Sequence, residues 1–396
     1  MSLQSSVSQL ESIDFVERAR ALVPQLSERA NATEQERQVP ETTIEAFHEA
    51  GFFRLLQPKR WGGFEEDPRV FFDVLMEIAG ACPSSAWVLG VVSVHNWQLA
   101  LFDEKAQADV WANDARTLIS SSYMPVGKVR MSDGGYQLSG KWGFSSGCDA
   151  CQWVFLGAFV PPAEEGGRPE MRTFLLPRKD YTIVDDWHVS GLAGTGSKSV
   201  VVENVFVPEH RTHVMTTKVG PISPGAIDSP LYRIPFGQLF TRTVATPAVG
   251  MARAALEHFK ELSLERRSRA DGKRALDDPT TAELIAQSEA VLDEVLLVLH
   301  RDYERIIESA FAGDPLSTRE RVAYRYHSST ATDACAKLVS TLFAASGGQA
   351  IYTEHPLNRL FQSVHAARAH YANNPFKSAR NYGGVELGLD TTDHFI

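Results

Sequence analysis

The chain has 396 residues, enough for two or three domains, and its 43% hydrophobic and 22% charged residues are typical of a soluble globular protein. A formal net charge of −10 argues against nucleic acid or an anionic membrane surface as the main partner. The sequence has neither the run of about 18 apolar residues that a membrane span needs nor a secretory signal, so we expect a cytoplasmic protein with no membrane partner.

Residues 1–116 predict an α-helical domain. Apolar residues recur at helical spacing over much of the segment from Phe15 to Ala81. Pro83-Ser84-Ser85 is expected to cap a long apolar helix that runs from Ala86 to about Phe102.

Two side chains of that long helix are candidates for a binding site. Trp87 and His95 are eight residues apart, which places them on roughly the same side of the helix. His95 and Asn96 inside an apolar helix form either a hydrogen-bonded pair in the core or the wall of a pocket. Spacing alone favours the core pair.

Residues 117–219 predict a middle β domain of barrel-like form, because short alternating segments separated by glycines replace the helical pattern. The expected strands are Leu118–Tyr123, Gly135–Ser139, Val154–Val160, Arg172–Leu176 and Val200–Val207. The glycines between Gly191 and Gly196 resemble a dinucleotide fingerprint, but they precede a strand and open no helix. A Rossmann site is therefore excluded.

The stretch from Gly140 to Trp153 connects two of these strands and carries two short hydroxyl side chains. Ser145 and Ser146 precede Gly147, which lets a ligand approach the backbone closely. Small hydrogen-bonding groups are thus placed to hold the edge of a flat ligand. An ordinary β-turn uses the same residue types, and the residues alone favour the turn.

Cys148 and Cys151 form the one C-x-x-C pair among four cysteines. A zinc site needs two more ligands at suitable spacing, and Cys82 and Cys335 are single and distant in sequence. A thioredoxin-like pair would start a helix, whereas this pair leads into a strand. We expect buried thiols and no metal site.

Residues 220–396 predict a bundle of four long helices. They are expected from Gly237 to about Ala270, from Thr280 to Ala312, from Thr318 to Ser346 and from Pro356 to Ala372. Basic residues gather at the end of the first of these helices: Arg266, Arg267, Arg269, Lys273 and Arg274. Such a run is either a solvated face or a docking site for a phosphate group.

This order of helical, β and helical parts, with four local motifs, resembles the acyl-CoA dehydrogenase fold over nearly the whole chain. The motifs are Gly51-Phe52 with Trp61-Gly62-Gly63, Gly140-Lys141 with Phe144-Ser145-Ser146-Gly147, Gly191–Ser197 with Val205-Phe206-Val207-Pro208, and Arg242 with Gly250. The resemblance implies an α+β, mainly α fold with an N-terminal helical domain, a middle β domain and a C-terminal four-helix bundle.

The resemblance fails where acyl-CoA dehydrogenases carry their catalytic base. The two positions for that carboxylate fall on Ala372-Asn373-Asn374 and on Thr241, and neither offers a general base. The chain is more similar to the oxygenase components of two-component flavin-dependent monooxygenases on this fold. These include p-hydroxyphenylacetate hydroxylases, dibenzothiophene monooxygenases and, nearest, 3-hydroxy-9,10-seconandrosta-triene-dione hydroxylases. The closer match lies in Val94–Phe102, Ile119–Tyr123, Ser145–Asp149 and Ala366–Pro375.

That resemblance implies a cofactor, partners and a reaction. The cofactor is reduced FMN, with FAD as the alternative, and molecular oxygen is the co-substrate. A separate NAD(P)H-dependent flavin reductase supplies the reduced flavin. A phenol, in the nearest group steroid-derived, is hydroxylated ortho to its hydroxyl through a C(4a)-hydroperoxyflavin. A homotetramer is expected.

The resemblance also implies roles for single residues. Ser146, with Ser145 beside it, contacts the N5 edge of the flavin, and Ser121, Ser122 and Tyr123 hold the pyrimidine side of the ring. Arg267 binds the flavin phosphate, since a guanidinium suits phosphate oxygens. Trp87, His95 and Trp97 form the walls of the substrate pocket, and His370 is the base that takes the phenol proton. An acyl-CoA dehydrogenase with bound FAD and a non-catalytic relative remain the alternatives.

Overall fold

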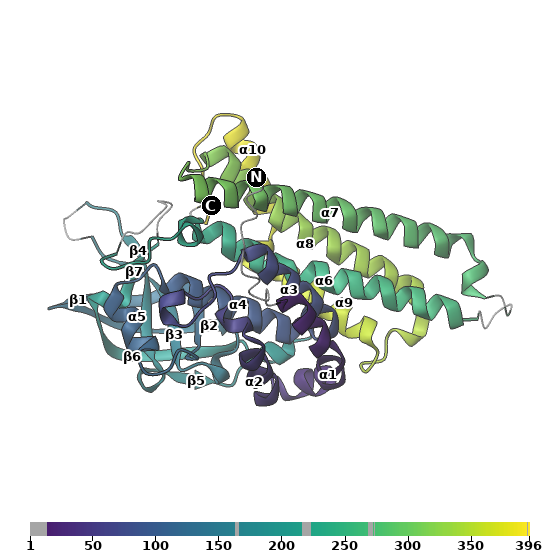
Figure 1. Cartoon of the computed structure of the whole chain (residues 1–396), viewed down its shortest axis with the longest axis horizontal. Helices are drawn as coiled ribbons and strands as arrows, with labels where there is room; N and C mark the ends of the chain where they lie inside the picture. Colours follow the sequence, from purple (N-terminus) through teal and green to yellow (C-terminus); the bar gives the residue numbers. More distant parts are fainter. Residues whose placement is uncertain (1–13, 163–165, 216–222, 268–271, 273, 394) are drawn as a thin grey trace, which may run out of the picture.

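The structure, a computed structural model, describes residues 14–396 except 163–165, 216–222, 268–271, 273 and 394. The sheet lies toward one end of the molecule, and the long C-terminal helices extend away from it side by side (Figure 1). The α+β, mainly α fold predicted from the sequence is confirmed. No helix among the described residues is long and apolar enough to cross a membrane.

The N-terminal part contains five helices: α1 (Phe15–Glu36), α2 (Glu41–Ala50), α3 (Pro68–Ala81), α4 (Pro83–Leu99) and α5 (Glu104–Trp111). Helix α4 starts three residues earlier than expected. Its first residue is Pro83, a favoured first residue because it lacks the amide proton that would go unbonded there. The expected side-chain cap is absent, and the Ser85 hydroxyl lies 3.0 Å from Cys82 Sγ. Every residue of α4 is buried, so this helix is the centre of the fold.

The middle part is one seven-stranded sheet with the order β5-β6-β2-β1-β3-β4-β7. Its strands are β1 (Ile119–Ser132), β2 (Gly135–Ser145), β3 (Trp153–Val160), β4 (Glu170–Pro177), β5 (Thr182–Val184), β6 (Lys198–Pro208) and β7 (Thr212–Val214). All five predicted strands are present, and the two three-residue edge strands β5 and β7 were not expected. The pair β1–β3 is parallel and the other pairs are antiparallel.

The parallel pairing of β1 with β3 determines in which core each side chain of β1 packs. Ser120 and Ser122 pair with Val154 and Leu156, which belong to the core of the sheet domain. Ser121 pairs with Phe155, which packs instead with residues of α4 and α5. Neighbouring residues of β1 therefore face different cores, as the alternation of a strand requires.

The C-terminal part contains α6 (Phe236–Glu265), α7 (Pro279–Ala312), α8 (Thr318–Ser346), α9 (Pro356–Ala369) and α10 (Pro375–Glu386). The four long helices α6–α9 match the predicted bundle, and α10 was not expected. Ser317 and Glu320 form a capping box that begins α8. Helix α9 ends three residues before the predicted end, because His370 adopts an extended conformation and caps it. Helix α4 contacts both β1 and α6, so one helix connects the sheet to the bundle.

Candidate active site

Ser146 lies in the tight turn that follows β2, against helix α4. Phe144, near the end of β2, and Gly147, in the turn, have φ values of +62° and +69°. A Cβ atom on Gly147 would come within 2.7 Å of Val88 Cγ1, so the turn can approach α4 only with glycine there. Trp87 Nε1 donates a hydrogen bond of 3.2 Å to Ser146 Oγ. The turn thus presents a short hydroxyl beside a buried indole.

A chain of hydroxyl groups continues from Ser146 into the loop before β6. Ser146 Oγ lies 2.7 Å from Ser197 Oγ, which lies 2.7 Å from Thr195 Oγ1. Thr195 Oγ1 in turn donates to the carbonyl of Leu192 over 2.8 Å. Thr195 and Ser197 were not singled out from the sequence, although both lie in the Gly191–Ser197 motif, because short hydroxyl residues are common in loops.

Ser145 does not share the environment of Ser146. Its hydroxyl donates to Ser120 Oγ over 3.1 Å, and both residues are fully buried. The structure therefore places Ser146 on the turn and Ser145 inside the sheet domain. Only Ser146 keeps some exposure, at 8%.

The three residues of β1 that were predicted to hold the pyrimidine side of a flavin do not act as one group. Ser121 and Ser122 point to opposite faces of the strand. The Tyr123 hydroxyl donates to Gln98 Oε1, and burial raises the pKa of Tyr123 well above its usual range. The hydroxyls of Ser121 and Ser122 therefore do not point to one ring together, and the role expected for the three residues stays a prediction for their backbone groups.

His370 lies where α9 ends, next to Trp87 and Phe240. Its ring centroid is 5.5 Å from that of Trp87 and 6.0 Å from that of Phe240. Burial, and then the charge of Arg325, lower the pKa of His370 to about 4, so the imidazole is neutral near pH 7. Nδ1 accepts a hydrogen bond of 3.1 Å from the backbone N–H of Ala372. The proton of the neutral ring is therefore on Nε2.

His95 has the opposite tautomer. It is fully buried, and Nδ1 lies 2.6 Å from the carbonyl oxygen of Ile119, so Nδ1 carries the proton and donates it. Burial lowers the pKa of His95 to about 4. Within the described part of the chain, Nε2 has no hydrogen-bond partner. His95 thus holds a buried, unpaired hydrogen-bond acceptor.

A continuous series of aromatic contacts joins the two histidines. The ring of Tyr123 lies 6.1 Å from His95 and 5.6 Å from Phe240, which contacts His370. The two contacts of Tyr123 are edge-to-face and that between Phe240 and His370 is tilted, and together they hold the rings in a fixed arrangement. The cluster of Trp87, His95, Tyr123, Phe240 and His370 is called the aromatic cluster below.

Trp97 lies behind this cluster and not in its first layer. Two residues along a helix turn by about 200°, so Trp97 faces away from His95. Its indole stacks on Phe236 at 6.1 Å and donates to the carbonyl of Leu231 over 3.0 Å. Phe236 separates it from Tyr123. The prediction that Trp97 lines the site directly is corrected.

The structure does not bring Arg267 to the aromatic cluster. Arg267 follows the C-terminal end of α6, and Phe240 lies near the other end, about 40 Å away at 1.5 Å per residue. Of its basic neighbours, Arg266 donates to the carbonyl of Ala345 and Arg274 pairs with Asp277. Arg269 and Lys273 lie outside the described residues. The C-terminal end of α6 and the aromatic cluster are therefore separate regions of one chain.

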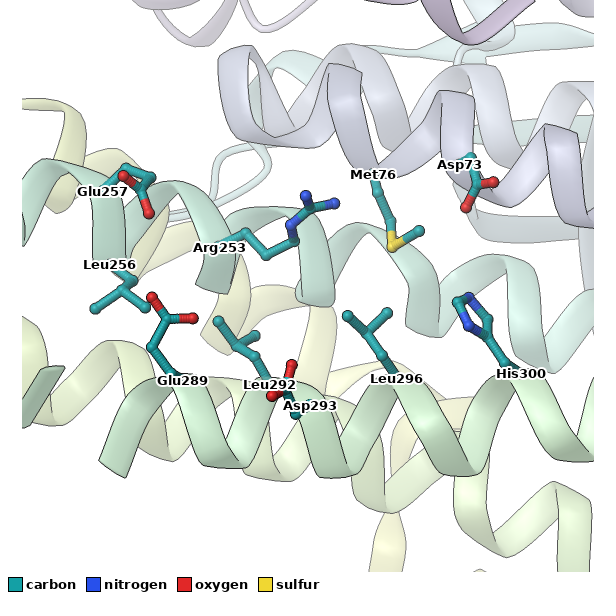
Figure 2. A pocket seen from close by; sticks show the side chains of 10 residues that line it. All are labelled: Asp73, Met76, Arg253, Leu256, Glu257, Glu289, Leu292, Asp293, Leu296 and His300. Carbon is teal, nitrogen blue, oxygen red and sulfur yellow. The ribbon is translucent and has the colours of Figure 1, made fainter. Parts of the chain in front are cut away.

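A cavity of about 460 Å³ lies elsewhere, between α3, α6 and α7 (Figure 2). Four carboxylates, Arg253, His300 and four apolar side chains line it, and no aromatic carbon ring does. The carboxylates are Asp73, Glu257, Glu289 and Asp293. This cavity contains no residue that the sequence singled out, and its negative charge disfavours a phosphate or a phenolate.

The chemistry of the aromatic cluster and the hydroxyl chain fits a reduced flavin ring. Aromatic side chains suit a flat ring, and neutral hydroxyls suit its N–H and carbonyl edge. Both histidines are neutral near pH 7 and add no buried charge. Cys148 and Cys151 are buried free thiols, and burial raises the pKa of Cys148 to about 12. No group of metal ligands occurs among the described residues.

Comparison with known proteins agrees with this chemistry. Residues 11–115 match the family described as acyl-CoA dehydrogenase, N-terminal domain, and residues 242–375 match acyl-CoA dehydrogenase, C-terminal domain. HsaA of Rhodococcus jostii, the oxygenase subunit of a flavin-dependent monooxygenase, is 40% identical over 96% of this chain and 100% of its own length. HsaA of Mycobacterium tuberculosis is 37% identical over 99% and 100%. The p-hydroxyphenylacetate 3-hydroxylase oxygenase component of Acinetobacter baumannii is 30% identical over 96% and 90%.

Two solved structures support the same assignment. The crystal structure of 3-HSA hydroxylase from Rhodococcus sp. RHA1 is 39% identical, with a TM-score of 0.90 over 97% of this chain and 99% of that one. XiaF from Streptomyces sp., in complex with FADH2 and glycerol, is 25% identical, with a TM-score of 0.88 over 96% of each chain. The fold is thus that of a flavin enzyme with acyl-CoA dehydrogenase architecture. The chain belongs to the family of flavin-dependent monooxygenase oxygenase subunits, which confirms the resemblance drawn from its sequence.

Proposed function

We propose that this enzyme hydroxylates a phenolic substrate, in the size range of a steroid-derived phenol, at the carbon next to the hydroxyl group. Reduced FMN, with reduced FAD as the alternative, is supplied by a separate NAD(P)H-dependent reductase. The names of the relatives, which include a p-hydroxyphenylacetate 3-hydroxylase and a 3-HSA hydroxylase, support an aromatic substrate. All four cysteines are free thiols, which supports a cytoplasmic location.

One observation carries the proposal: Trp87 contacts both Ser146 and His370. Its indole N–H donates to Ser146 Oγ over 3.2 Å, and its ring lies 5.5 Å from that of His370. These two contacts support a role for Ser146 at the ring edge of a flavin and for His370 on the reacting side. When bound, the reduced flavin reacts with oxygen and supplies the electrophilic oxygen atom. Trp87, Tyr123 and Phe240 exclude water from the reaction.

The tautomers of the two histidines suggest a division of roles that differs from the expectation. A base that takes the phenol proton needs a free nitrogen lone pair, and Nδ1 of His370 is already bonded to Ala372 N–H. We therefore assign the acceptor role to Nε2 of His95, which has no partner in the described residues. His370 donates through Nε2–H and holds a developing negative charge on oxygen. Both remain catalytic, with the base moved to His95.

The positions of Arg267 and of several exposed side chains support assembly with further copies of the chain, for which we propose a homotetramer. Arg267 lies about 40 Å along α6 from Phe240, so its proposed contact with a flavin phosphate requires a second copy of the chain. Phe376, Leu387 and Leu389 are 69%, 85% and 66% exposed. Apolar side chains with such exposure are typical of surfaces that another chain covers.

The test is a coupling measurement on the full chain. Reduced FMN, oxygen and a set of phenols are mixed with the protein, and hydroxylated product and hydrogen peroxide are both measured. The proposal expects product from at least one bulky phenol. Peroxide without product for every phenol in the set would overturn it.

Two variants separate the roles of the histidines. Free phenols ionise near pH 10, so the His95→Ala variant is expected to lose about a hundredfold in hydroxylation at pH 7 and to regain most of it as the pH approaches 10. His370→Ala is expected to lose coupling at every pH. The control is His365→Ala, an exposed residue of α9 that binds Ser340. If the hydroxylation rate of His95→Ala varied with pH in parallel with that of the wild type, the base would be a group other than His95.

A further inference from the structure

The hydroxyl chain from Ser146 to Leu192 has only one direction in which all its hydrogen bonds can form. The carbonyl oxygen of Leu192 can only accept, so the single hydroxyl proton of Thr195 points to it over 2.8 Å. Thr195 Oγ1 must then accept from Ser197 over 2.7 Å. Ser197, whose proton is used in this way, must accept from Ser146, also over 2.7 Å.

The hydroxyl of Ser146 is consequently an acceptor toward any ligand. Its proton is given to Ser197, and one lone pair receives the indole N–H of Trp87 over 3.2 Å. A hydroxyl oxygen has two lone pairs, so one more hydrogen bond can be accepted and none can be donated. Ser146 is 8% exposed, whereas Ser197 and Thr195 are 4% and 1% exposed. The open end of the chain is therefore at Ser146.

The backbone fixes the closed end of this chain. Leu192 has a φ of +54°, a conformation that residues other than glycine rarely adopt, and Gly196 has a φ of +52°. The backbone N–H of Gly147 donates to the carbonyl of Thr195 over 2.9 Å, which ties the turn of Ser146 to the loop of Thr195. The two loops hold the hydroxyl groups at hydrogen-bonding distance, and reversal of the chain would break the bond to Leu192.

We propose that Thr195 and Ser197 are positioning residues that make the site prefer reduced over oxidised flavin. The inference rests on the proposed function, in which Ser146 meets the N5 edge of the flavin ring. N5 carries a hydrogen atom in the reduced ring and only a lone pair in the oxidised ring. As an acceptor, Ser146 Oγ can bond to the N5–H group of the reduced ring. Toward the oxidised ring, its lone pair faces the lone pair of N5, and no hydrogen bond forms. The expected discrimination is about fivefold to tenfold, the effect of one net hydrogen bond.

The test is the ratio of two dissociation constants for the full chain. Oxidised FMN is titrated by fluorescence quenching, and reduced FMN is titrated without oxygen. In the Thr195→Val variant the proton of Ser197 is released, so Ser146 can turn its own proton toward N5. We expect this variant to bind oxidised FMN about fivefold to tenfold more tightly and to bind reduced FMN within about twofold of the wild type. A purely structural defect would weaken both.

Two further variants complete the test. Thr195→Ser keeps the hydroxyl and is expected to keep the wild-type ratio. Thr173→Val is the matched control, because the buried Thr173 hydroxyl of β4 has no hydrogen-bond partner in the described residues. If the wild type binds reduced FMN but the ratio of the two dissociation constants is unchanged in Thr195→Val, only the role of the hydroxyl chain is overturned. A wild-type protein that binds neither form of FMN would overturn the proposed function as well.

Discussion

The chain ends on the same region that holds His370, and a buried ion pair fastens it there. Arg325 of α8 and Asp393 have side chains that are 2% and 3% exposed, with Nε 3.5 Å from Oδ2. Arg325 also donates to the carbonyl of Ala372, two residues after His370. The ring of Phe395 lies 6.2 Å from Phe236. We predict that Asp393→Ala releases this C-terminal segment.

The magnitude follows from the burial of both charges. Burial lowers the pKa of Arg325, which shows that water solvates its charge poorly, and Asp393 is the carboxylate that opposes this effect. Removing one partner of a buried pair leaves an uncompensated charge and costs about 3–5 kcal/mol. At 1.4 kcal/mol per factor of ten, a loss of about 3 kcal/mol raises the detached population of the segment at least a hundredfold.

Carboxypeptidase digestion measures that population directly, since the enzyme cleaves only a detached terminus. We expect digestion of Asp393→Ala to be at least tenfold faster than that of the wild type, and a lower midpoint in urea. Asp390→Ala, an exposed position in the same segment, is the control. Arg325→Met combined with Asp393→Ala is expected to recover part of the urea stability, because no buried charge remains. Digestion of Asp393→Ala within twofold of the wild-type rate would refute the reasoning.

Three further predictions concern pH, the turn of Ser146 and the thiols. The folded-state pKa of His95 lies near 4, below its unfolded value of about 6.5, so the native state loses stability as the pH falls from 6.5 toward 4. Between pH 7 and 4.5, the free energy of unfolding measured in urea should fall by about 2.5 kcal/mol less in His95→Asn than in the wild type. An equal fall in the two proteins would contradict this. Gly147→Ala should lower stability by about 1–3 kcal/mol in thermal unfolding, because its Cβ would meet Val88 at 2.7 Å; an unchanged midpoint would mean that the turn is not fixed. All four cysteines are buried, so a thiol reagent should label them only at the rate of unfolding; fast labelling of any one would show local opening.

The long helices were predictable because their apolar stripes and their ends are local features. The bounds of α8 agree with the prediction, since the capping box of Ser317 and Glu320 begins the helix at Thr318 and Gly347 follows its last residue. Four short elements were missed: β5 and β7 have three residues each, α5 has eight and α10 has twelve. Segments of this length carry too few apolar repeats for a periodic pattern to stand out. The parallel pairing of β1 with β3 was also missed, because pairing is a property of the fold and not of either segment.

The sequence brought forward residues that the structure places in contact, but not the hydrogen bonds between them, and their roles stay predictions. Ser146, His95 and His370 are in the region that the sequence singled out, and Trp87 connects two of them. Their roles depend on partners that no motif encodes, such as Ile119 O for His95 and Ala372 N for His370. Trp97 illustrates a second limit of the sequence. It is only two residues from His95, but two residues along a helix turn the side chain to the other side.

At the two positions where acyl-CoA dehydrogenases carry a catalytic carboxylate, the structure has buried, hydrogen-bonded neutral side chains. Asn373 is buried, and its side-chain nitrogen donates to the carbonyls of Val244 and Ala367 over 3.1 and 2.9 Å. Thr241 is also buried, with its hydroxyl directed to the carbonyl of Gln238. Asn373 holds the end of α9 against α6, whereas the Thr241 bond lies within α6, and neither side chain can take a proton from a carbon acid. The polar chemistry of the site is thereby left to neutral groups, namely two imidazoles and a hydroxyl. A site of that kind can bind a phenol and activated oxygen without a buried anion to repel either.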